Sequence, residues 1–269
     1  MTRFWKYQGL GNDFILVDWR GRANIPGELT RAVCDRHFGI GGDGILAWLD
    51  GPDGAPFMRV FNTDGSIADM CGNGLRCFAR WLVEEQGLSP ESRVIGSDAG
   101  GQETLTHMTD GRVTAIAVNL GPARHAGPAQ VTVEDRVFAG HDLFLGNPHF
   151  VIPRAPDGFE PGTHGPGLSV HAHFPRDTNV EWLEILSSRE ARVTVYERGC
   201  GLTRACGTGG AGAVAVGVLL GQLDIAADLL VHQPGGDLMY RVDAQSRDVW
   251  MTGPAEPVFV GETALLDAA

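Results

Sequence analysis

The sequence predicts an α+β protein of two pseudosymmetric domains, each a curved and mostly antiparallel sheet wrapped around a central helix. The same order of patterns occurs twice along the 269 residues: short strand-like segments, a Cys-Gly-x-Gly turn, an apolar helical run and further strand-like segments. The two turns begin at Cys71 and Cys206. A weak internal duplication accounts for this order most simply.

In the first half, short apolar runs bounded by Gly, Asp and Pro predict strands. Helices are expected at 28–35 and 74–87. The second has apolar residues at three- and four-residue spacing, and Gly87 stops it. The expected strands cover residues 4–7, 14–18, 45–49 and 57–62, with several short ones between 93 and 120.

In the second half, a buried central helix is expected at 209–220. It lies inside an apolar run, 205–221, that is slightly short for a membrane span, which takes roughly 20 residues. The stretch 153–173 is rich in Gly, Pro and His, which predicts an exposed loop. The expected strands lie between 131 and 152 and at 179–186, 192–197, 229–232, 237–242, 248–252 and 258–261.

A boundary between the halves is expected at 121–128, which begins with Gly121-Pro122. The predicted domains are 1–120 plus 256–269, carrying Cys71, and 121–255, carrying Cys206. Segments 121–122 and 252–257 are expected to act as hinges when the domains close on a ligand.

The composition excludes several classes of function. A net charge of −12 argues against nucleic acid or an anionic membrane as partner. Lys6 is the only lysine, and it lies in a strand-like context. The chain therefore has no phosphate-loop lysine, and Schiff-base chemistry with pyridoxal phosphate is not expected, so no cofactor is predicted. Five cysteines, an odd number, and an N-terminus without an apolar signal core favour a reducing cytoplasm.

The two cysteine turns carry the strongest chemical signal. Cys71 and Cys206 each precede a helix, where unpaired backbone N–H groups and the helix dipole would stabilise a thiolate. A lone buried cysteine is usually inert packing, and Cys34 and Cys77 are interpreted in that way, whereas Cys200 stays open. The paired placement instead favours two thiols that face one ligand.

Metal and nucleotide sites fit these motifs poorly. The five-residue gaps in Cys71-x5-Cys77 and Cys200-x5-Cys206 exceed the spacing usual in structural zinc sites, so no metal is predicted. Residues 39–44 and 207–212 both match Gly-x-Gly-x-x-Gly. The first, however, lies between a helix and a strand, and the second lies too far from its preceding strand. The second helix end is still expected to bind an anion such as a carboxylate.

Polar residues at the strand ends are candidates for holding a substrate. Glu197-Arg198 follows a strand and precedes the second cysteine loop, so Arg198 could clamp a second carboxylate, although a surface ion pair would look the same. Taken singly, His149 and the four asparagines are ordinary turn residues. The asparagines are Asn12, Asn62, Asn147 and Asn179.

Together these motifs resemble the diaminopimelate epimerases, in the family's order and along the whole chain. The matching stretches are Gly9-Leu-Gly-Asn-Asp-Phe14, Phe61-Asn-Thr-Asp-Gly65, Cys71-Gly-Asn-Gly-Leu-Arg-Cys77, Gly146-Asn-Pro-His149, Asn179-Val180, Glu197-Arg-Gly199, Ala205-Cys-Gly-Thr-Gly209 and Met251-Thr-Gly-Pro-Ala255. The resemblance implies a cofactor-independent isomerase that interconverts LL- and meso-diaminopimelate in lysine and peptidoglycan precursor biosynthesis. It also implies a cytoplasmic homodimer with its site in the cleft between two domains.

The resemblance also implies residue roles. Cys71 and Cys206 would be the catalytic acid and base, with His149 and Glu197 assisting the thiols. The reacting carboxylate would be held by Gly72, Asn73, Gly207 and Thr208. The rest of the substrate would be bound by Asn12, Asn62, Asn147, Asn179, Glu197 and Arg198.

Two departures and several alternatives stay open. Gly44 stands where many members have Gln, and Leu202 replaces a frequent Glu, which leaves the fit of the substrate open. The near alternative is a racemase or epimerase of the same fold acting on proline, hydroxyproline or histidine. A thiol redox protein, a metal-binding protein and a non-catalytic binding protein are the alternatives from other classes.

Overall fold

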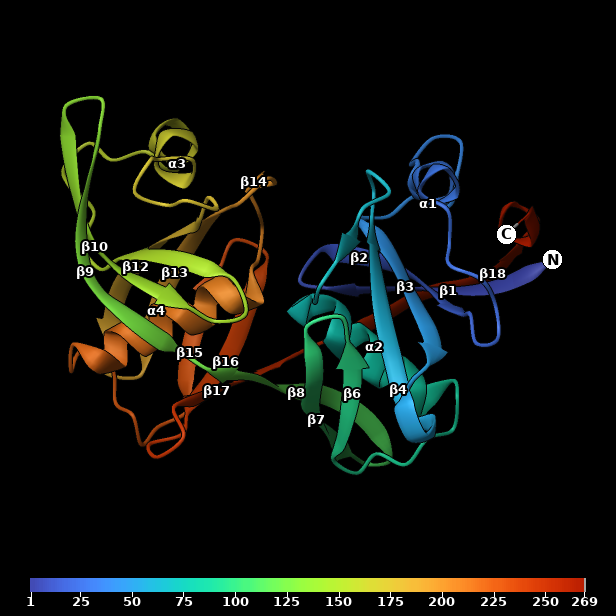
Figure 1. Cartoon of the computed structure of the whole chain (residues 1–269). Helices are drawn as coiled ribbons and strands as arrows, with labels where there is room; N and C mark the ends of the chain where they lie inside the picture. The colour runs from blue at the N-terminus through green and yellow to red at the C-terminus, as the bar shows by residue number, and fades with distance from the viewer. Residues whose placement is uncertain (269) are drawn as a thin grey trace. The chain divides into compact units, whose positions relative to one another are not determined.

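The computed structural model describes residues 1–268 and divides the chain into two compact units (Figure 1). Unit 1 comprises Met1–Val118 with Gly253–Ala269, and unit 2 comprises Asn119–Thr252. The predicted α+β class, with mostly antiparallel sheets and few helices, is confirmed.

The sheet of unit 1 has the neighbour order β18-β1-β2-β3-β4-β6-β7-β8. Successive pairs are antiparallel, antiparallel, parallel, antiparallel, parallel, antiparallel and antiparallel. The strands are β1 (Thr2–Gly9), β2 (Asn12–Asp18), β3 (Gly44–Asp50), β4 (Pro56–Asn62), β6 (Arg93–Ser97), β7 (Gly100–Thr109), β8 (Arg112–Pro122) and β18 (Glu256–Thr263), with the short β5 (Ile67–Ala68) paired to β4.

The sheet of unit 2 has the order β9-β10-β11-β12-β13-β15-β16-β17 and repeats the same sequence of parallel and antiparallel pairs. Its strands are β9 (Arg124–Val133), β10 (Arg136–Phe144), β11 (Pro148–Ile152), β12 (Asn179–Ser187), β13 (Glu190–Glu197), β15 (Leu229–Gln233), β16 (Gly236–Val242) and β17 (Asp248–Gly253), with the short β14 (Gly201–Leu202) paired to β13.

The helices occupy matching places in the two repeats. A short helix joins the third and fourth strands of each repeat, counted in sheet order, and a long helix follows the short strand. The short helices are α1 (Gly27–Cys34) and α3 (Pro161–Ser169), and the long ones are α2 (Gly72–Glu84) and α4 (Gly207–Leu219). Two 3₁₀ turns, η1 (Pro52–Gly54) and η2 (Leu265–Ala268), lie outside this pattern. The repeats are therefore β18 with β1–β8, and β9–β17, which is the duplication expected from the sequence.

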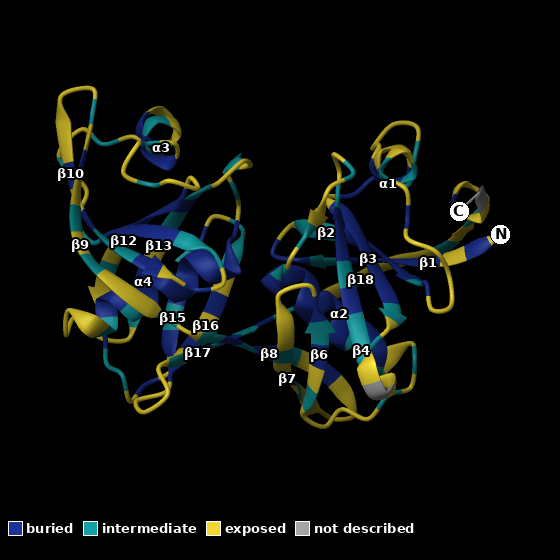
Figure 2. Ribbon diagram, viewed as in Figure 1, coloured by how far each residue is buried: buried dark blue, intermediate teal, exposed yellow. Residues whose placement is uncertain are grey.

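Each long helix is buried against its own sheet (Figure 2). The apolar face of α2 includes Phe78 and Trp81, and the Trp81 indole packs edge-on against Trp5 and Trp48, with ring centroids 5.2 and 5.8 Å apart. Helix α4 is made of Gly, Ala, Val, Thr and Leu and is buried nearly all round, as its uniform apolar composition predicts. Within residues 1–268, no helix is both long and apolar enough to cross a membrane.

One expectation from the sequence needs correction. The stretch 153–173 is not only an exposed loop, because it contains α3, whose inner side buries His164 and Leu168. Its Gly and Pro content concealed the helix: Pro161 opens the first turn, and Gly165 lets the helix approach Tyr196 closely. The segment 121–128, expected as the boundary between the domains, consists of the end of β8, Ala123 and the start of β9.

Candidate active site

Each of the two cysteines is the N-cap of a central helix. Cys71 precedes α2 with φ −139° and ψ 115°, and Cys206 precedes α4 with φ −122° and ψ 115°. The Sγ atoms accept the backbone N–H of Gly74 at 3.4 Å and of Gly209 at 3.3 Å. The predicted placement at two helix N-termini is confirmed, and both sulfurs have the same local geometry.

The first turns of the two helices can cradle a carboxylate. Their first backbone N–H groups have no partner within the helix, and the helix dipole favours an anion there. Gly72 and Gly207 open these turns and carry no side chain that would shield the amides. Asn73 and Thr208 follow and are buried, and Thr208 Oγ1 lies 3.6 Å from Cys206 Sγ. The predicted cradle residues therefore adjoin their cysteines in each unit.

In unit 1, Asn12 lies beside the thiol of Cys71. Its Oδ1 is 3.9 Å from Cys71 Sγ and 3.4 Å from Asn73 Nδ2. Its Nδ2 donates to Asp43 Oδ2 at 2.7 Å, and the same oxygen accepts the backbone N–H of Asp13 at 3.0 Å. The amide of Asn12 is thus held by a carboxylate that the sequence interpretation missed. The signal was present as the acidic residue in Gly41-Gly-Asp-Gly44.

A network of ion pairs among neighbouring charged residues holds Asp43 in place. Arg36 bridges Asp13 at 2.6 Å and Asp43 at 2.8 Å, and the buried Lys6 contacts Asp13 at 2.6 Å and the carbonyl of Gly41. Burial alone would raise the pKa of Asp13, but hydrogen bonds from Arg36 and Lys6 lower it to about 2. The single lysine is therefore tied into a structural ion pair.

Asn62 ends β4 and makes local turn contacts. Its Nδ2 donates to Ser66 Oγ at 2.9 Å, and Ser66 Oγ in turn donates to Asp64 Oδ1 at 2.6 Å. Asn62 is paired in register with Gly44 on β3. The side chain of Asn62 therefore has a turn role, and its binding role stays a prediction.

Gly44 has a structural role beyond the missing side chain. A Cβ atom at this position would lie 2.6 Å from the carbonyl oxygen of Phe61, which is backbone and cannot rotate away. We expect Gly44→Ala to lower the free energy of unfolding by about 1–3 kcal/mol, because β3 and β4 must separate locally. Urea denaturation of both proteins measures this. An unchanged unfolding midpoint would show that the strands accommodate a side chain at 44.

In unit 2, two further side chains hold the loop of Cys206. Gln233 Oε1 accepts the Cys206 N–H at 2.7 Å, and Gln233 Nε2 donates to the Cys206 carbonyl at 3.3 Å. Tyr240 donates its hydroxyl proton to the Gly207 carbonyl at 2.9 Å. These contacts fix the backbone around the sulfur. They come from β15 and β16, and no local pattern near Cys206 could have indicated them.

The electrostatics of Cys206 correct one expectation. The helix dipole was expected to favour a thiolate, but burial, followed by the negative charge of Glu197, raises the pKa of Cys206 well above its ordinary value. Burial also raises the pKa of Glu197, against the opposing effect of hydrogen bonds from Thr203 and Cys206. The thiol of Cys206 therefore holds its proton near neutral pH, beside a carboxyl group whose affinity for a proton is increased.

The remaining predicted residues of unit 2 form a connected group. His149 lies between Glu181 and Asn147, with Nδ1 2.7 Å from Glu181 Oε1 and Nε2 2.6 Å from Asn147 Oδ1. Asn179 Nδ2 donates to the Pro148 carbonyl at 3.1 Å. Glu181 was missed, although an acidic residue between Val180 and Trp182 in an apolar strand was the available signal.

Arg198 lies at the exposed end of this group. Its backbone N–H donates to Asn179 Oδ1 at 2.9 Å, and its Nη1 donates to the Arg176 carbonyl at 3.1 Å. The side chain is therefore anchored by one nitrogen, and the rest of its guanidinium fork remains available for a carboxylate.

The other cysteines divide as the sequence suggested. Cys34 and Cys77 are buried, and burial raises their pKa values to about 11 and about 12. Cys200 is exposed in the loop before Cys206. Over residues 1–268, no cluster of three or more His, Cys, Asp or Glu side chains has the arrangement of a metal site.

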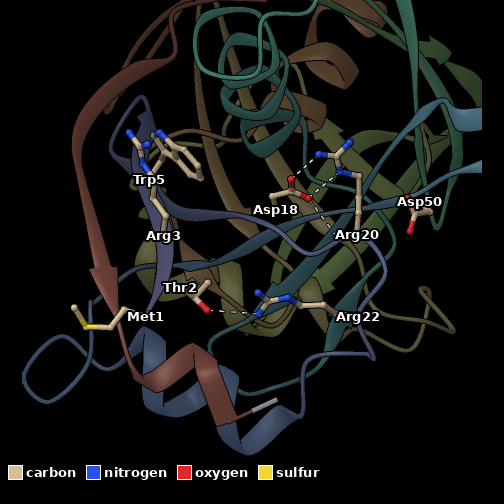
Figure 3. A pocket seen from close by; sticks show the side chains of 8 residues that line it. All are labelled: Met1, Thr2, Arg3, Trp5, Asp18, Arg20, Arg22 and Asp50. Carbon is tan, nitrogen blue, oxygen red and sulfur yellow. Dashed lines mark hydrogen bonds and ion pairs between the residues drawn. The ribbon is translucent and has the colours of Figure 1, made fainter.

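A separate concavity of about 500 Å³ lies on unit 1 and contains none of the predicted site residues (Figure 3). Arg20 donates two hydrogen bonds to Asp18 there, of 2.8 and 2.6 Å, and Arg22 donates to Thr2 Oγ1. It lacks a thiol and a helix N-terminus, so its chemistry differs from that of the two cysteine turns. Its lining residues are Met1, Thr2, Arg3, Trp5, Asp18, Arg20, Arg22 and Asp50.

Comparison with known proteins decides the family. The sequence profile described as diaminopimelate epimerase matches residues 4–126 and 144–258. A protein named diaminopimelate epimerase from Pelotomaculum thermopropionicum is 39% identical over 277 residues, covering 96% of this chain and 98% of its own length. The chain belongs to the diaminopimelate epimerase family.

Solved structures of other proteins share the fold of this member of the epimerase family. A probable proline racemase from Agrobacterium radiobacter K84 aligns with a TM-score of 0.75 and 13% identity, covering 98% of this chain and 93% of that one. A hydroxyproline epimerase from Agrobacterium vitis aligns with a TM-score of 0.74 and 15% identity, covering 97% and 91%. At such low sequence identities the similarity establishes only that the fold is shared. It says nothing about the substrate of this chain.

Proposed function

We propose that this epimerase interconverts LL- and meso-diaminopimelate by exchanging the α-proton between Cys71 and Cys206, without a cofactor. The observation that carries the proposal is the pair of cysteine N-caps at equivalent places in two structural repeats. Inversion at carbon needs a base on one face and an acid on the other. Two equivalent thiols supply both, and their roles exchange when the reaction runs backwards. Membership of the diaminopimelate epimerase family supports the substrate.

In the proposed reaction, Cys206 first passes its proton to Glu197, whose raised pKa makes it a suitable acceptor. The resulting thiolate removes the α-proton of the substrate, and the Cys71 thiol delivers a proton to the opposite face. The helix N-terminal amides stabilise the negative charge that develops on the carboxylate. In the reverse reaction the Cys71 thiolate is the base. One proton is removed and one is delivered, so the substrate changes only in configuration.

The proposed site also grips the distal amino-acid group of diaminopimelate. Arg198 would bind its carboxylate, because a guanidinium fork matches a carboxylate with two hydrogen bonds. Glu197, Asn12, Asn62, Asn147 and Asn179 are the proposed polar partners along the substrate. A second distal group of this kind distinguishes diaminopimelate from proline, hydroxyproline and histidine.

Incubation of the enzyme with LL-diaminopimelate in deuterated water, without added cofactor, tests the function. We expect meso-diaminopimelate that carries one deuterium at the inverted α-carbon. Exchange with proline, hydroxyproline or histidine but not with diaminopimelate would overturn the substrate assignment. Mass spectrometry and NMR of the product give the position of the deuterium.

The raised pKa of Cys206 gives a prediction about its reactivity. Only the thiolate is alkylated, so we expect iodoacetamide to modify Cys206 slowly near pH 7.5 and faster as the pH rises beyond 9. Glu197→Gln removes the neighbouring carboxylate and should increase the rate at a given pH. Peptide mass spectrometry across a pH series gives both rates. A rate that levels off below pH 7 would contradict the direction of the shift.

We also propose a cytoplasmic homodimer. The odd number of cysteines supports a reducing compartment, and the net charge of −12 supports a small-molecule substrate rather than nucleic acid or an anionic membrane as partner. Light scattering of the purified protein measures the oligomeric state, and a mass of one chain at micromolar concentration would overturn the dimer.

A further inference from the structure

Three side chains in unit 2 are linked in a row by hydrogen bonds. The proposed reaction does not explain which atom of each side chain donates and which accepts. Glu181 on β12 contacts His149 on β11, and His149 contacts Asn147 at the start of β11, at 2.7 and 2.6 Å. Glu181 is fully buried, and His149 is 1% exposed. Both ring nitrogens of His149 are therefore engaged away from solvent, and neither is left to act directly on a thiol.

The contact with Asn147 determines where the proton of His149 lies. Asn147 turns its Oδ1, an acceptor, toward Nε2, so Nε2 must carry a hydrogen and donate it. On the other side, Nδ1 and the Glu181 carboxyl group share one proton. An acid that donates to a neutral ring and an imidazolium that donates to a carboxylate both satisfy this contact. In either case Asn147 Nδ2 is left pointing away from His149 as a donor.

The contact with His149 is the only side-chain hydrogen bond that Glu181 makes in the described part of the chain. Its Oε2 is buried and makes no hydrogen bond to any residue in the described part of the chain. Its Oε1 lies close to the first turn of α4, where a Cβ atom on Gly209 would come within 3.0 Å. Burying a carboxyl group with one partner usually costs stability relative to an apolar residue. Its placement therefore indicates a function that acts through His149.

The equivalent asparagine in unit 1 is held the opposite way round. Asn12 opens β2 as Asn147 leads into β11, and these strands occupy the same place in the two repeats. Asp43 accepts from Asn12 Nδ2, which turns Oδ1 as an acceptor toward Cys71 Sγ and Asn73 Nδ2. The first repeat thus presents the amide oxygen of Asn12, and the second presents the amide nitrogen of Asn147.

We propose that Glu181 is a positioning residue: through His149 it holds the Asn147 amide with its Nδ2 donor toward the substrate. In unit 1, Asp43 holds the Asn12 amide with its Oδ1 acceptor toward the substrate. The inference rests on the proposed function for its ligand, an α-amino acid. A carboxylate is matched by the Asn147 donor and an ammonium group by the Asn12 acceptor. The two asparagines therefore offer opposite partners to an amino-acid group, a donor in unit 2 and an acceptor in unit 1.

The tautomer of His149 tests the inference in the wild-type protein, independently of activity. Long-range ¹H–¹⁵N NMR spectra distinguish a ring protonated at Nε2 from one protonated only at Nδ1, and His149→Gln identifies the signal. We expect a hydrogen on Nε2 in the wild-type protein, and its loss or partial loss in Glu181→Leu. A neutral ring protonated only at Nδ1 in the wild-type protein would reverse the Asn147 amide and overturn the proposal.

A double-mutant cycle tests whether Glu181 acts through Asn147. Glu181→Leu is expected to raise KM for diaminopimelate about 10-fold with a smaller change in kcat, and Glu181→Gln, which can still donate to Nδ1, should restore most of the loss. In an Asn147→Ala background, Glu181→Leu should raise KM less than 2-fold, because the amide that it orients is gone. Full additivity of the two effects would assign Glu181 a structural role only.

His164→Gln is the matched control, since His164 is a second buried histidine of unit 2 outside the proposed site. It is expected to leave KM unchanged. If Glu181→Leu does not fold, the wild-type tautomer still decides the question. If the wild-type protein does not epimerise diaminopimelate, the proposed function fails while the NMR result continues to report the orientation of the asparagine.

Discussion

Replacement of Cys206 by alanine is expected to lower kcat/KM for epimerisation by about 10²- to 10⁴-fold, the size usual for a general acid or base. The same loss is expected for Cys71→Ala, because in the proposed reaction each thiol serves one face of the α-carbon. Deuterium incorporation and optical rotation measure the two variants in both reaction directions. Activity within 10-fold of the wild-type protein in either variant would rule out the two-thiol mechanism.

Cys34→Ala supplies the control for these substitutions. Cys34 is buried in α1, where burial raises the pKa of its thiol to about 11, and it lies outside the proposed site. We expect this variant to keep wild-type kcat and KM and to lose about 1 kcal/mol of stability through the small cavity. A large loss of activity in this variant would mean that cysteine replacement disturbs the fold rather than the chemistry.

Arg198→Ala is expected to raise KM for diaminopimelate about 10- to 100-fold with a smaller change in kcat. A hydrogen bond to a charged group contributes about 1.5–3 kcal/mol, and the distal carboxylate lies away from the reacting carbon. Arg198→Lys should recover only part of the loss, because an ammonium group cannot form the two-pronged contact. Steady-state kinetics give the separate changes in KM and kcat.

Arg192→Ala is the matched control, since Arg192 is exposed on β13, the strand that ends just before Arg198, and pairs with Glu184 at 2.5 Å. An exposed pair of this kind contributes little. We expect unchanged kinetics and a shift in stability below about 1 kcal/mol. Equal effects of the two arginine substitutions on KM would assign Arg198 to general surface charge and not to the distal carboxylate.

The position of the two thiols could be predicted because N-cap chemistry is local. A cysteine followed by Gly-x-Gly and an apolar run carries the whole signal within a few residues, and Cys71 and Cys206 both cap their helices as expected. Their catalytic roles stay a prediction. The class of fold followed from the same repetition of patterns, since most strands and the helices α1, α2 and α4 had local signals.

The residues that hold these sites could not be found in the same way. Asp43, Glu181 and Gln233 reach the site by folding from other strands or loops, so nothing beside the cysteines points to them. The raised pKa of Cys206 was missed for the same reason, because burial and the charge of Glu197 on β13 outweigh the dipole of its own helix. Helix α3 was missed because Gly and Pro have low helix propensity, whereas Gly165 is needed there for close packing against Tyr196.

The place of β18 in the first repeat has a consequence for synthesis of the chain. Strand β1 pairs along its length with β18, from Thr2 opposite Thr263 to Gln8 opposite Glu256. As the chain leaves the ribosome, every residue of unit 2 emerges before the strand that completes unit 1. The amino-terminal half, although made first, therefore waits with one edge of its sheet unpaired, while the carboxyl-terminal half has all its strands and can close first.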